Sequence, residues 1–153
     1  MENIMVKVIK GRDSVHLGVS LGVGPGRANN IDDVTLVQYM LNLWLQHPET
    51  ALVKSNAGDR GKPLATDGII GPKTKAQILL FQEDQKYSGF SFICDGRMDR
   101  YDSDFASKRI YYSMYLLHIS LMALHGVPVH EMRYFPGFPK RILAMARRAS
   151  QAA

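Results

Sequence analysis

The sequence predicts a mainly α-helical domain with one β-hairpin at its N-terminus. Residues 14–23 alternate apolar residues with small or polar ones, which is the two-residue period of a strand. Residues 110–124 carry apolar side chains at steps of four and three, which is the period of a helix. Two helix-start signals, an asparagine cap at Asn30 and the pair Gly71-Pro72, add further helices. These patterns favour a helical bundle.

Composition excludes several classes of protein. The 153 residues suit one domain, and 46% hydrophobic with 22% charged residues is the balance of a globular chain, not a disordered one. No apolar run approaches the roughly 20 residues that a membrane-spanning helix needs. The single cysteine, Cys94, cannot form an internal disulfide or a Cys-rich zinc site, and we expect it to be a small core residue.

The first residues do not resemble a secretory signal peptide. Glu2 is acidic, and no long apolar segment follows it. We therefore expect synthesis in the cytoplasm without a signal peptide. Action in the periplasm or cell wall would then require a non-classical route.

The hairpin and the first helix are expected in the first third of the chain. Residues 4–9 pair with residues 14–23 across a turn at 11–13, and the apolar face of the hairpin must pack on the rest of the domain. Asn30 then caps a helix that runs to about Gln46. Its apolar stripe predicts the core residues Val34, Val37, Leu41 and Trp44.

Three further helices are expected after a long loop. Residues 48–66 show no periodicity and are interpreted as a functional insertion or a flap pinned by Leu52 and Val53. The next helix runs from Gly71-Pro72 to about Lys86. The third begins near Ser103 or Asp104 and ends at Gly126, residues 133–139 are irregular, and a basic helix spans Lys140–Ser150. The predicted regions are 1–23 (hairpin), 24–125 (helical domain) and 126–153 (basic, aromatic extension).

A short internal repeat lies in the middle of the chain. Asp67-Gly68-Ile69-Ile70 recurs 28 residues later as Asp95-Gly96-Arg97-Met98. An Asp-Gly pair usually means only a turn, because the aspartate accepts hydrogen bonds from its own turn and glycine takes positive φ.

The surrounding residues resemble the small three-helix type of peptidoglycan-binding domain. The stretch from Asp67 to Ala76 (DGIIGPKTKA), followed by Ile78 and Phe81-Gln82, is similar to that family's central motif. Residues 30–42 are similar to its first helix, with Val37-Gln38 and Leu41-Asn42 as the matching pairs. The resemblance covers about residues 24–125 and implies a three-helix, peptidoglycan-binding-like bundle that binds the bacterial cell wall. Gln77, the sequence after Asp95-Gly96 and the length of the loop 48–66 depart from the family's pattern.

The candidate binding residues follow the two turns and the nearby aromatic residues. The start of the helix after Gly71 favours anions, and stem peptides of peptidoglycan end in carboxylates. Sugars stack on aromatic faces, so aromatic residues near the turns are candidates as well. Each candidate also has an ordinary structural interpretation, as part of a turn, of the scaffold or of the core. The candidates are Asp67, Gly68, Lys73, Thr74, Tyr87, Phe90, Asp95 and Gly96.

Catalytic and metal sites are not expected. His118 and His125 lie about two turns apart on one predicted helix, and we expect His118 to be partly buried and hydrogen-bonded. His130-Glu131 lacks a second histidine at the spacing of a helical zinc site. No carboxylate pair or Cys–His pair stands out, so the sequence predicts a protein that is not an enzyme and has no cofactor.

The leading hypothesis is a non-catalytic module that binds the glycan or stem peptide of peptidoglycan. The net charge is +5, and from Gly126 onward five basic residues face one acid, which indicates an acidic protein partner for the tail as a further option. The alternative is a protein-interaction adaptor of a phage or secretion system that keeps the fold without sugar binding. A small cell-wall hydrolase or toxin is third, and neither nucleic acid nor a membrane span is expected.

Overall fold

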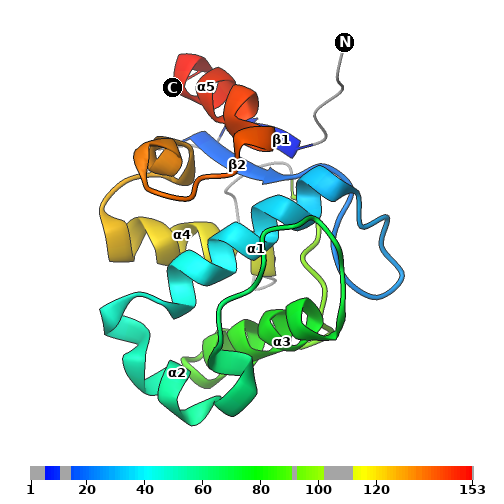
Figure 1. The fold of residues 1–153 in the computed structure, drawn as a ribbon, viewed down its shortest axis with the longest axis vertical. Helices are drawn as coiled ribbons and strands as arrows, with labels where there is room; N and C mark the ends of the chain where they lie inside the picture. Colours follow the sequence, from blue (N-terminus) through cyan, green and yellow to red (C-terminus); the bar gives the residue numbers. More distant parts are fainter. Residues whose placement is uncertain (1–5, 11–14, 91–92, 102–111, 153) are drawn as a thin grey trace.

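Helices make up most of the chain, and a two-stranded antiparallel hairpin lies at its N-terminal end, as predicted (Figure 1). The computed structural model describes residues 6–10, 15–90, 93–101 and 112–152. The elements are β1 (Val6–Lys10), β2 (Val15–Val19), α1 (Ile31–Leu45), η1 (Pro48–Thr50), α2 (Ala51–Asn56), η2 (Gly58–Gly61), α3 (Pro72–Tyr87), α4 (Ser113–His125), η3 (Val129–Tyr134), η4 (Lys140–Ile142) and α5 (Leu143–Ala152).

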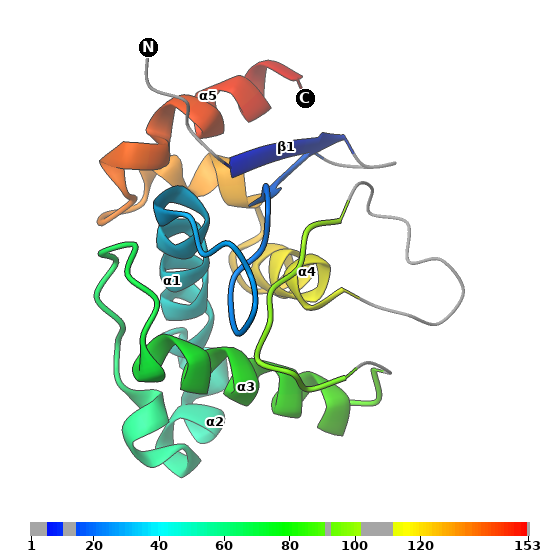
Figure 2. The same ribbon diagram turned by 90° about the vertical axis from the view of Figure 1, so that its right-hand side faces the viewer.

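The elements stack in layers along the long axis of the molecule. Helix α5 packs on the hairpin, α1 and α4 lie against its other side, and α3 crosses below them with α2 beside it (Figures 1 and 2). The strands pair in register, with Val8 opposite Leu17. Every residue of β2 is buried, because helices cover both sides of the strand.

Strand β2 ends earlier than the alternation predicts. The backbone N–H groups of Ser20 and Leu21 donate to the carboxylate of Asp33 at 2.8 and 2.9 Å. They are therefore diverted from a sheet ladder to the first turn of α1. Val23 nevertheless pairs with Met98 through an isolated antiparallel bridge. Asn30 caps α1 as predicted, since its side chain accepts a hydrogen bond from the backbone of Asp33.

The core lies where the helical stripes meet, and most predicted core positions are confirmed. Trp44 of α1 packs edge-on against Phe81 of α3, with ring centroids 5.0 Å apart. None of the described helices is long and apolar enough to cross a membrane. The buried residues include Val34, Val37, Leu41 and Trp44 of the first predicted stripe, Met114, Leu117 and Leu121 of the stripe in residues 110–124, and the motif residues Ile78 and Phe81.

The segment 48–66 is not the structureless loop that the sequence suggested. It contains η1, α2 and η2, and Leu52 is 74% exposed, so it does not pin the segment, whereas Val53 packs against the core. Side chains of α1 hold the later part, because Asn42 exchanges two hydrogen bonds with the backbone of Leu64, both 2.8 Å long.

The helix predicted from Ser103 or Asp104 begins later. Tyr112 has extended backbone angles and precedes α4, which starts at Ser113 and ends at Gly126 in the left-handed conformation, as expected for a C-terminal glycine. Residues 102–111 lie outside the described residues. Arg133 and Tyr134 belong to η3, so the irregular stretch is shorter than predicted. Cys94 is half-buried, not a core residue.

The C-terminal segment packs on the hairpin. Met145, Ala146 and Ala149 of α5 are buried, while Arg147 and Arg148 are exposed. Arg141 forms an ion pair with the buried carboxylate of Asp32 in α1. This helix therefore packs on the domain and keeps its two exposed arginines on the outer side.

Candidate functional site

A glutamine of α1 holds the first Asp-Gly turn. Gln38 is 1% exposed, and its Oε1 accepts a hydrogen bond from the backbone N–H of Gly68 at 2.9 Å. The two N–H atoms on its Nε2 are shared among the carbonyl of Ile69 at 3.0 Å, Asp67 Oδ1 at 3.1 Å and Thr74 Oγ1 at 3.2 Å. One side chain thus fixes both the turn and the start of α3.

The residues of this turn have separate roles. Gly68 has φ 73°, and a Cβ there would lie 2.4 Å from Ile31 Cγ1, so the position requires glycine. The N–H of Ile69 and the amide of Gln38 donate to the exposed carboxylate of Asp67 and lower its pKa. Two isoleucines directly after the Asp-Gly pair are typical of core residues, but this interpretation is wrong for Ile69, which is 68% exposed. Ile70 is partly buried and packs against the core.

A second glutamine holds the second turn in the same way. Gln82 of α3 accepts from the N–H of Gly96 at 2.8 Å. Its Nε2 lies 2.9 Å from the carbonyl of Arg97, 3.1 Å from Asp95 Oδ1 and 2.9 Å from Ser113 Oγ. The internal repeat is therefore a repeat of hydrogen-bonded geometry, with Ser113 in the place of Thr74.

The surroundings of the two turns differ. Met98 and Val23 exchange backbone hydrogen bonds of 2.8 and 3.0 Å next to the second turn, and Arg97 donates to the carbonyl of Pro25. Segment 22–29 therefore covers that turn. A Cβ on Gly24 would come within 2.3 Å of the Gly96 carbonyl. The first turn opens instead onto a groove.

This groove, called the α3 groove below, consists of two adjoining hollows of about 410 and 350 Å³ at the start of α3. Both hollows are lined by Leu64, Pro72 and Lys73. One extends to Lys62 and Gln77, and the other to Asp67 and Thr74. Among the described residues that line the hollows, none is aromatic.

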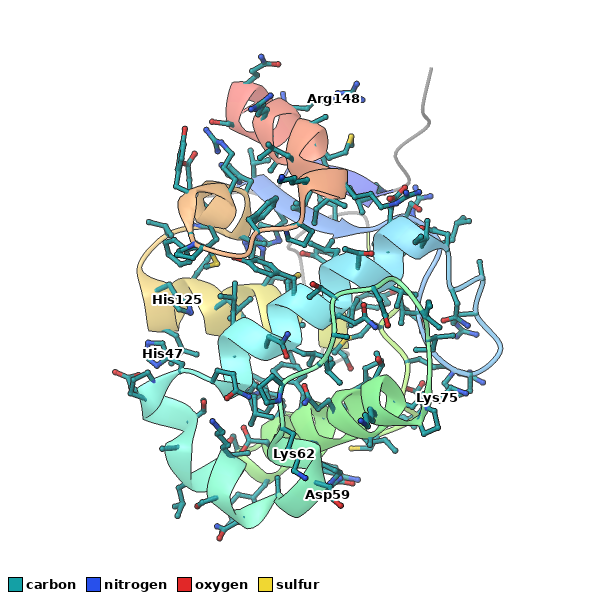
Figure 3. All side chains as sticks on the ribbon, in the orientation of Figure 1. His47, Asp59, Lys62, Lys75, His125 and Arg148 are labelled. Carbon is teal, nitrogen blue, oxygen red and sulfur yellow. The ribbon has the colours of Figure 1, made fainter. Side chains whose placement is uncertain are left out.

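The α3 groove combines charged side chains with an uncapped helix start. No side chain caps α3 at Gly71, and the first backbone bond of the helix runs from the N–H of Lys75 to the Gly71 carbonyl. Lys62 pairs with Asp59 at 3.0 Å, and Arg60 pairs with Glu83 at 3.1 Å. Figure 3 shows Asp59 and Lys62 together beside α2, at the opposite end of the molecule from Arg148.

Gln77 forms part of the wall of the groove and has an unused acceptor. The residue is 1% exposed, and its Nε2 donates to the carbonyl of Lys62 at 2.5 Å. Its Oε1 has no hydrogen-bond partner among the described residues. This orientation of the amide is fixed, because exchanging the two atoms would place two oxygens against each other.

The eight predicted binding residues do not form one site. Asp67, Lys73 and Thr74 line the groove, and Gly68 is buried and does not line it. Thr74 is also buried, and its hydroxyl accepts a hydrogen bond from Gln38. Asp95 and Gly96 belong to the covered second turn. At the far end of α3, Tyr87 is 92% exposed and lies roughly 20 Å along the helix from Thr74, and Phe90 packs against the core.

The sequence patterns name the three glutamines of this region as residues of a motif or departures from it, but they assign no structural role to any of them. Gln38 and Gln82 each follow a fully buried apolar residue, Val37 and Phe81, and such a polar residue inside an apolar stripe was the available signal. Gln77 was noticed only as a departure from the family's pattern. The structure shows where this departure lies, because Gln77 is one of the residues that line the groove.

The histidines form two separate clusters. His118 stacks on His16 of β2 with ring centroids 3.7 Å apart, while His125 lies against His47 (Figure 3). His118 is fully buried, and neither of its ring nitrogens has a hydrogen-bond partner among the described residues, contrary to expectation. Burial, with smaller effects from His16 and His130, lowers its pKa to about 2. The described residues contain no group of three or more metal-ligating side chains.

Comparison with protein families, curated proteins and solved structures gave no match. The interpretation of the site therefore depends on its geometry and chemistry.

Proposed function

We propose that this protein is a non-catalytic module that binds peptidoglycan, with its central helices forming a three-helix, peptidoglycan-binding-like bundle. The observation that supports this proposal best is the closure of the first Asp-Gly turn by Gln38 and Thr74. It joins the residues of the central motif and of the first-helix motif in one buried cluster next to the α3 groove. The resemblance in sequence thus involves residues that interact in the fold.

Co-sedimentation with purified cell-wall sacculi tests this function. The protein carries a net charge of +5, so the assay is run at low salt and at about 0.5 M salt to separate specific binding from attraction to anionic polymers. Co-sedimentation that persists at high salt supports the module, and loss of all binding contradicts it. The soluble fraction is also analysed for muropeptides, because their release would identify a hydrolase.

A second candidate function is a protein-interaction adaptor of a phage or secretion system. Its support is the exposed basic side of α5, with Arg147 and Arg148, and the nearby Tyr134, which is 74% exposed. An adaptor without wall affinity would remain in the supernatant with every sacculus preparation. Variants with Arg147→Gln and Arg148→Gln would then lose an acidic partner while keeping their stability, because both side chains are exposed.

A further inference from the structure

Three buried histidines meet where the hairpin joins the C-terminal part of the chain. His16 of β2, His118 of α4 and His130 of η3 are 1%, 0% and 2% exposed. Helix α4 and η3 pack on β2 and on each other, and α5 packs on the other side of the hairpin (Figure 1). These three imidazoles, called the histidine cluster below, therefore lie at the interface of the hairpin with α4 and η3.

The geometry of the histidine cluster suits uncharged rings. The rings of His16 and His118 stack with centroids 3.7 Å apart and planes 20° apart. Two neutral rings gain dispersion energy at this distance, whereas two imidazolium ions would repel each other strongly in a buried site. Protonation of both rings is therefore incompatible with the closed stack.

His118 has no group beside it that could compensate a positive charge. Neither of its ring nitrogens has a hydrogen-bond partner among the described residues. Burial lowers its pKa, and the charges that act on it, those of His16 and His130, lower the pKa further. A proton on His118 would thus create a buried cation without a partner, which is strongly unfavourable.

The other titratable groups next to the histidine cluster are already engaged. Glu131 Oε1 lies 3.3 Å from His130 Nε2 and 3.4 Å from Arg133 Nη1, so this carboxylate is shared on the side of η3. On the hairpin side, His16 Nδ1 lies 2.6 Å from the hydroxyl oxygen of Tyr101. These contacts leave His118 without a counter-charge.

The neighbouring elements do not supply a free carboxylate either. Asp32 of α1 pairs with Arg141, and Asp33 accepts hydrogen bonds from the backbone at the end of the hairpin. Neither β1 nor α5 contains an acidic residue. The charged residues of these two elements are Lys7, Lys10, Arg147 and Arg148.

We propose that the histidine cluster is a proton-operated switch that releases the hairpin from α4 and η3 in mild acid. In the closed form its imidazoles are neutral. Opening exposes them to water, where each can bind a proton, so acid favours the open form. The equilibrium constant for opening should rise about tenfold per pH unit below about 6.5 for each proton taken up.

The contact between α1 and α3 should stay closed in this transition. Trp44 of α1 packs on Phe81 of α3, and neither helix contains a histidine. The switch therefore differs from acid unfolding of the whole domain, in which both regions would open together.

Two probes on the full chain separate local opening from complete unfolding. Fluorescence of Trp44, the single tryptophan, reports on the contact with Phe81, and backbone amide NMR of Val15–Val19 reports on the hairpin. Both are followed from about pH 7.5 to about pH 3.5, and we expect the hairpin midpoint to lie at least about one pH unit above that of Trp44. Coincident midpoints, or hairpin signals that do not change in this range, would overturn the switch.

Matched variants assign the proton to the histidine cluster. His118→Phe keeps an aromatic ring on His16 but binds no proton, so the hairpin midpoint should fall by at least about one pH unit. His47→Gln removes a histidine outside the cluster, whose ring lies against His125 (Figure 3), and should shift the midpoint by less than about 0.3 pH unit.

Melting temperatures at neutral pH check that each variant folds. If His118→Phe does not fold, His130→Gln replaces it, and the comparison of the two probes on the unmodified chain depends on neither variant. A hairpin midpoint that stays the same in a folded cluster variant, or that moves equally in His47→Gln, would overturn the assignment.

Discussion

The first and second Asp-Gly turns are closed by the same hydrogen bonds but have different neighbours. In each, a buried glutamine accepts from the glycine N–H and donates to the aspartate, to a carbonyl and to a hydroxyl. The second turn is covered by segment 22–29, whereas the first borders the α3 groove. The recurring turn is therefore first a structural element closed by a buried glutamine, and we call this arrangement a joint. The segments around each joint decide whether it also borders a groove.

Replacing the two glutamines tests whether the joints are equivalent. We expect Gln38→Ala and Gln82→Ala each to lower the free energy of unfolding by about 3–4 kcal/mol, because each leaves a cavity and several buried polar groups without partners. Urea denaturation measures both losses. A loss below about 1 kcal/mol at either site would show that water replaces the amide and that the joint is not structural.

The two glutamine variants are expected to lose similar amounts of stability, whereas the two glycine variants should lose different amounts. Both have nearly the same φ, 73° at Gly68 and 75° at Gly96, but a Cβ would clash at 2.4 Å in the first turn and meet its nearest atom at 3.7 Å in the second. Gly68→Ala should therefore cost about 3 kcal/mol from strain and overpacking, and Gly96→Ala about 1 kcal/mol from strain alone. Similar melting temperatures for the two variants would contradict this difference.

Acid should act on the second turn before the first. Helix α4 carries both Ser113, which closes the second turn, and His118, whose pKa is lowered to about 2. Between that value and 6.5 the unfolded chain binds a proton that the folded chain does not, so stability falls by up to about 1.4 kcal/mol per pH unit as the pH drops below 6.5. Other buried histidines with lowered pKa values, such as His130, act in the same direction.

Urea titrations at about pH 7 and about pH 5 measure this loss, and His118→Leu should make it smaller by removing the proton-binding group. Amide exchange at Gly96 and Arg97 should rise before exchange at Gly68 and Ile69. If the free energy of unfolding falls as much between about pH 7 and about pH 5 in His118→Leu as in the unmodified protein, other groups cause the acid sensitivity.

The smallest effects are expected from the two hydroxyls. Thr74→Val and Ser113→Ala each remove one of the acceptors shared by a glutamine Nε2, which keeps its other partners. Each should cost about 1 kcal/mol in thermal or urea unfolding. A cost close to that of the glutamine variants would show that the hydroxyl, and not the other partners, holds the amide in place.

The parts of the fold that depend on local patterns could be predicted from the sequence. The stripe of Met114, Leu117 and Leu121 reports burial directly, and the alternation from Val15 to Val19 identifies the strand, although both faces of that strand are buried. The helices within 48–66 could not be predicted, because none of the residues of α2 is buried and side chains of α1 hold the segment from a distance.

The candidate site was predictable only in part for a similar reason. Asp67-Gly68 is visible as a pair, but its partner Gln38 lies 29 residues upstream, whereas Gln82 lies 13 residues before Asp95. Because these two spacings differ, no single sequence pattern identifies the glutamine that closes an Asp-Gly turn. The unused acceptor of Gln77 depends on where one amide points, which no sequence pattern records.

The burial of β2 on both sides has a consequence for biosynthesis. The hairpin is translated before α5, which covers one of its sides, and the other described elements come between them in the chain (Figures 1 and 2). Until α5 is translated, an apolar surface of the nascent chain stays open to water and to chaperones. The final compaction of the domain therefore waits for the release of its C-terminal helix, so translation stalled before Leu143 would leave the hairpin without its cover.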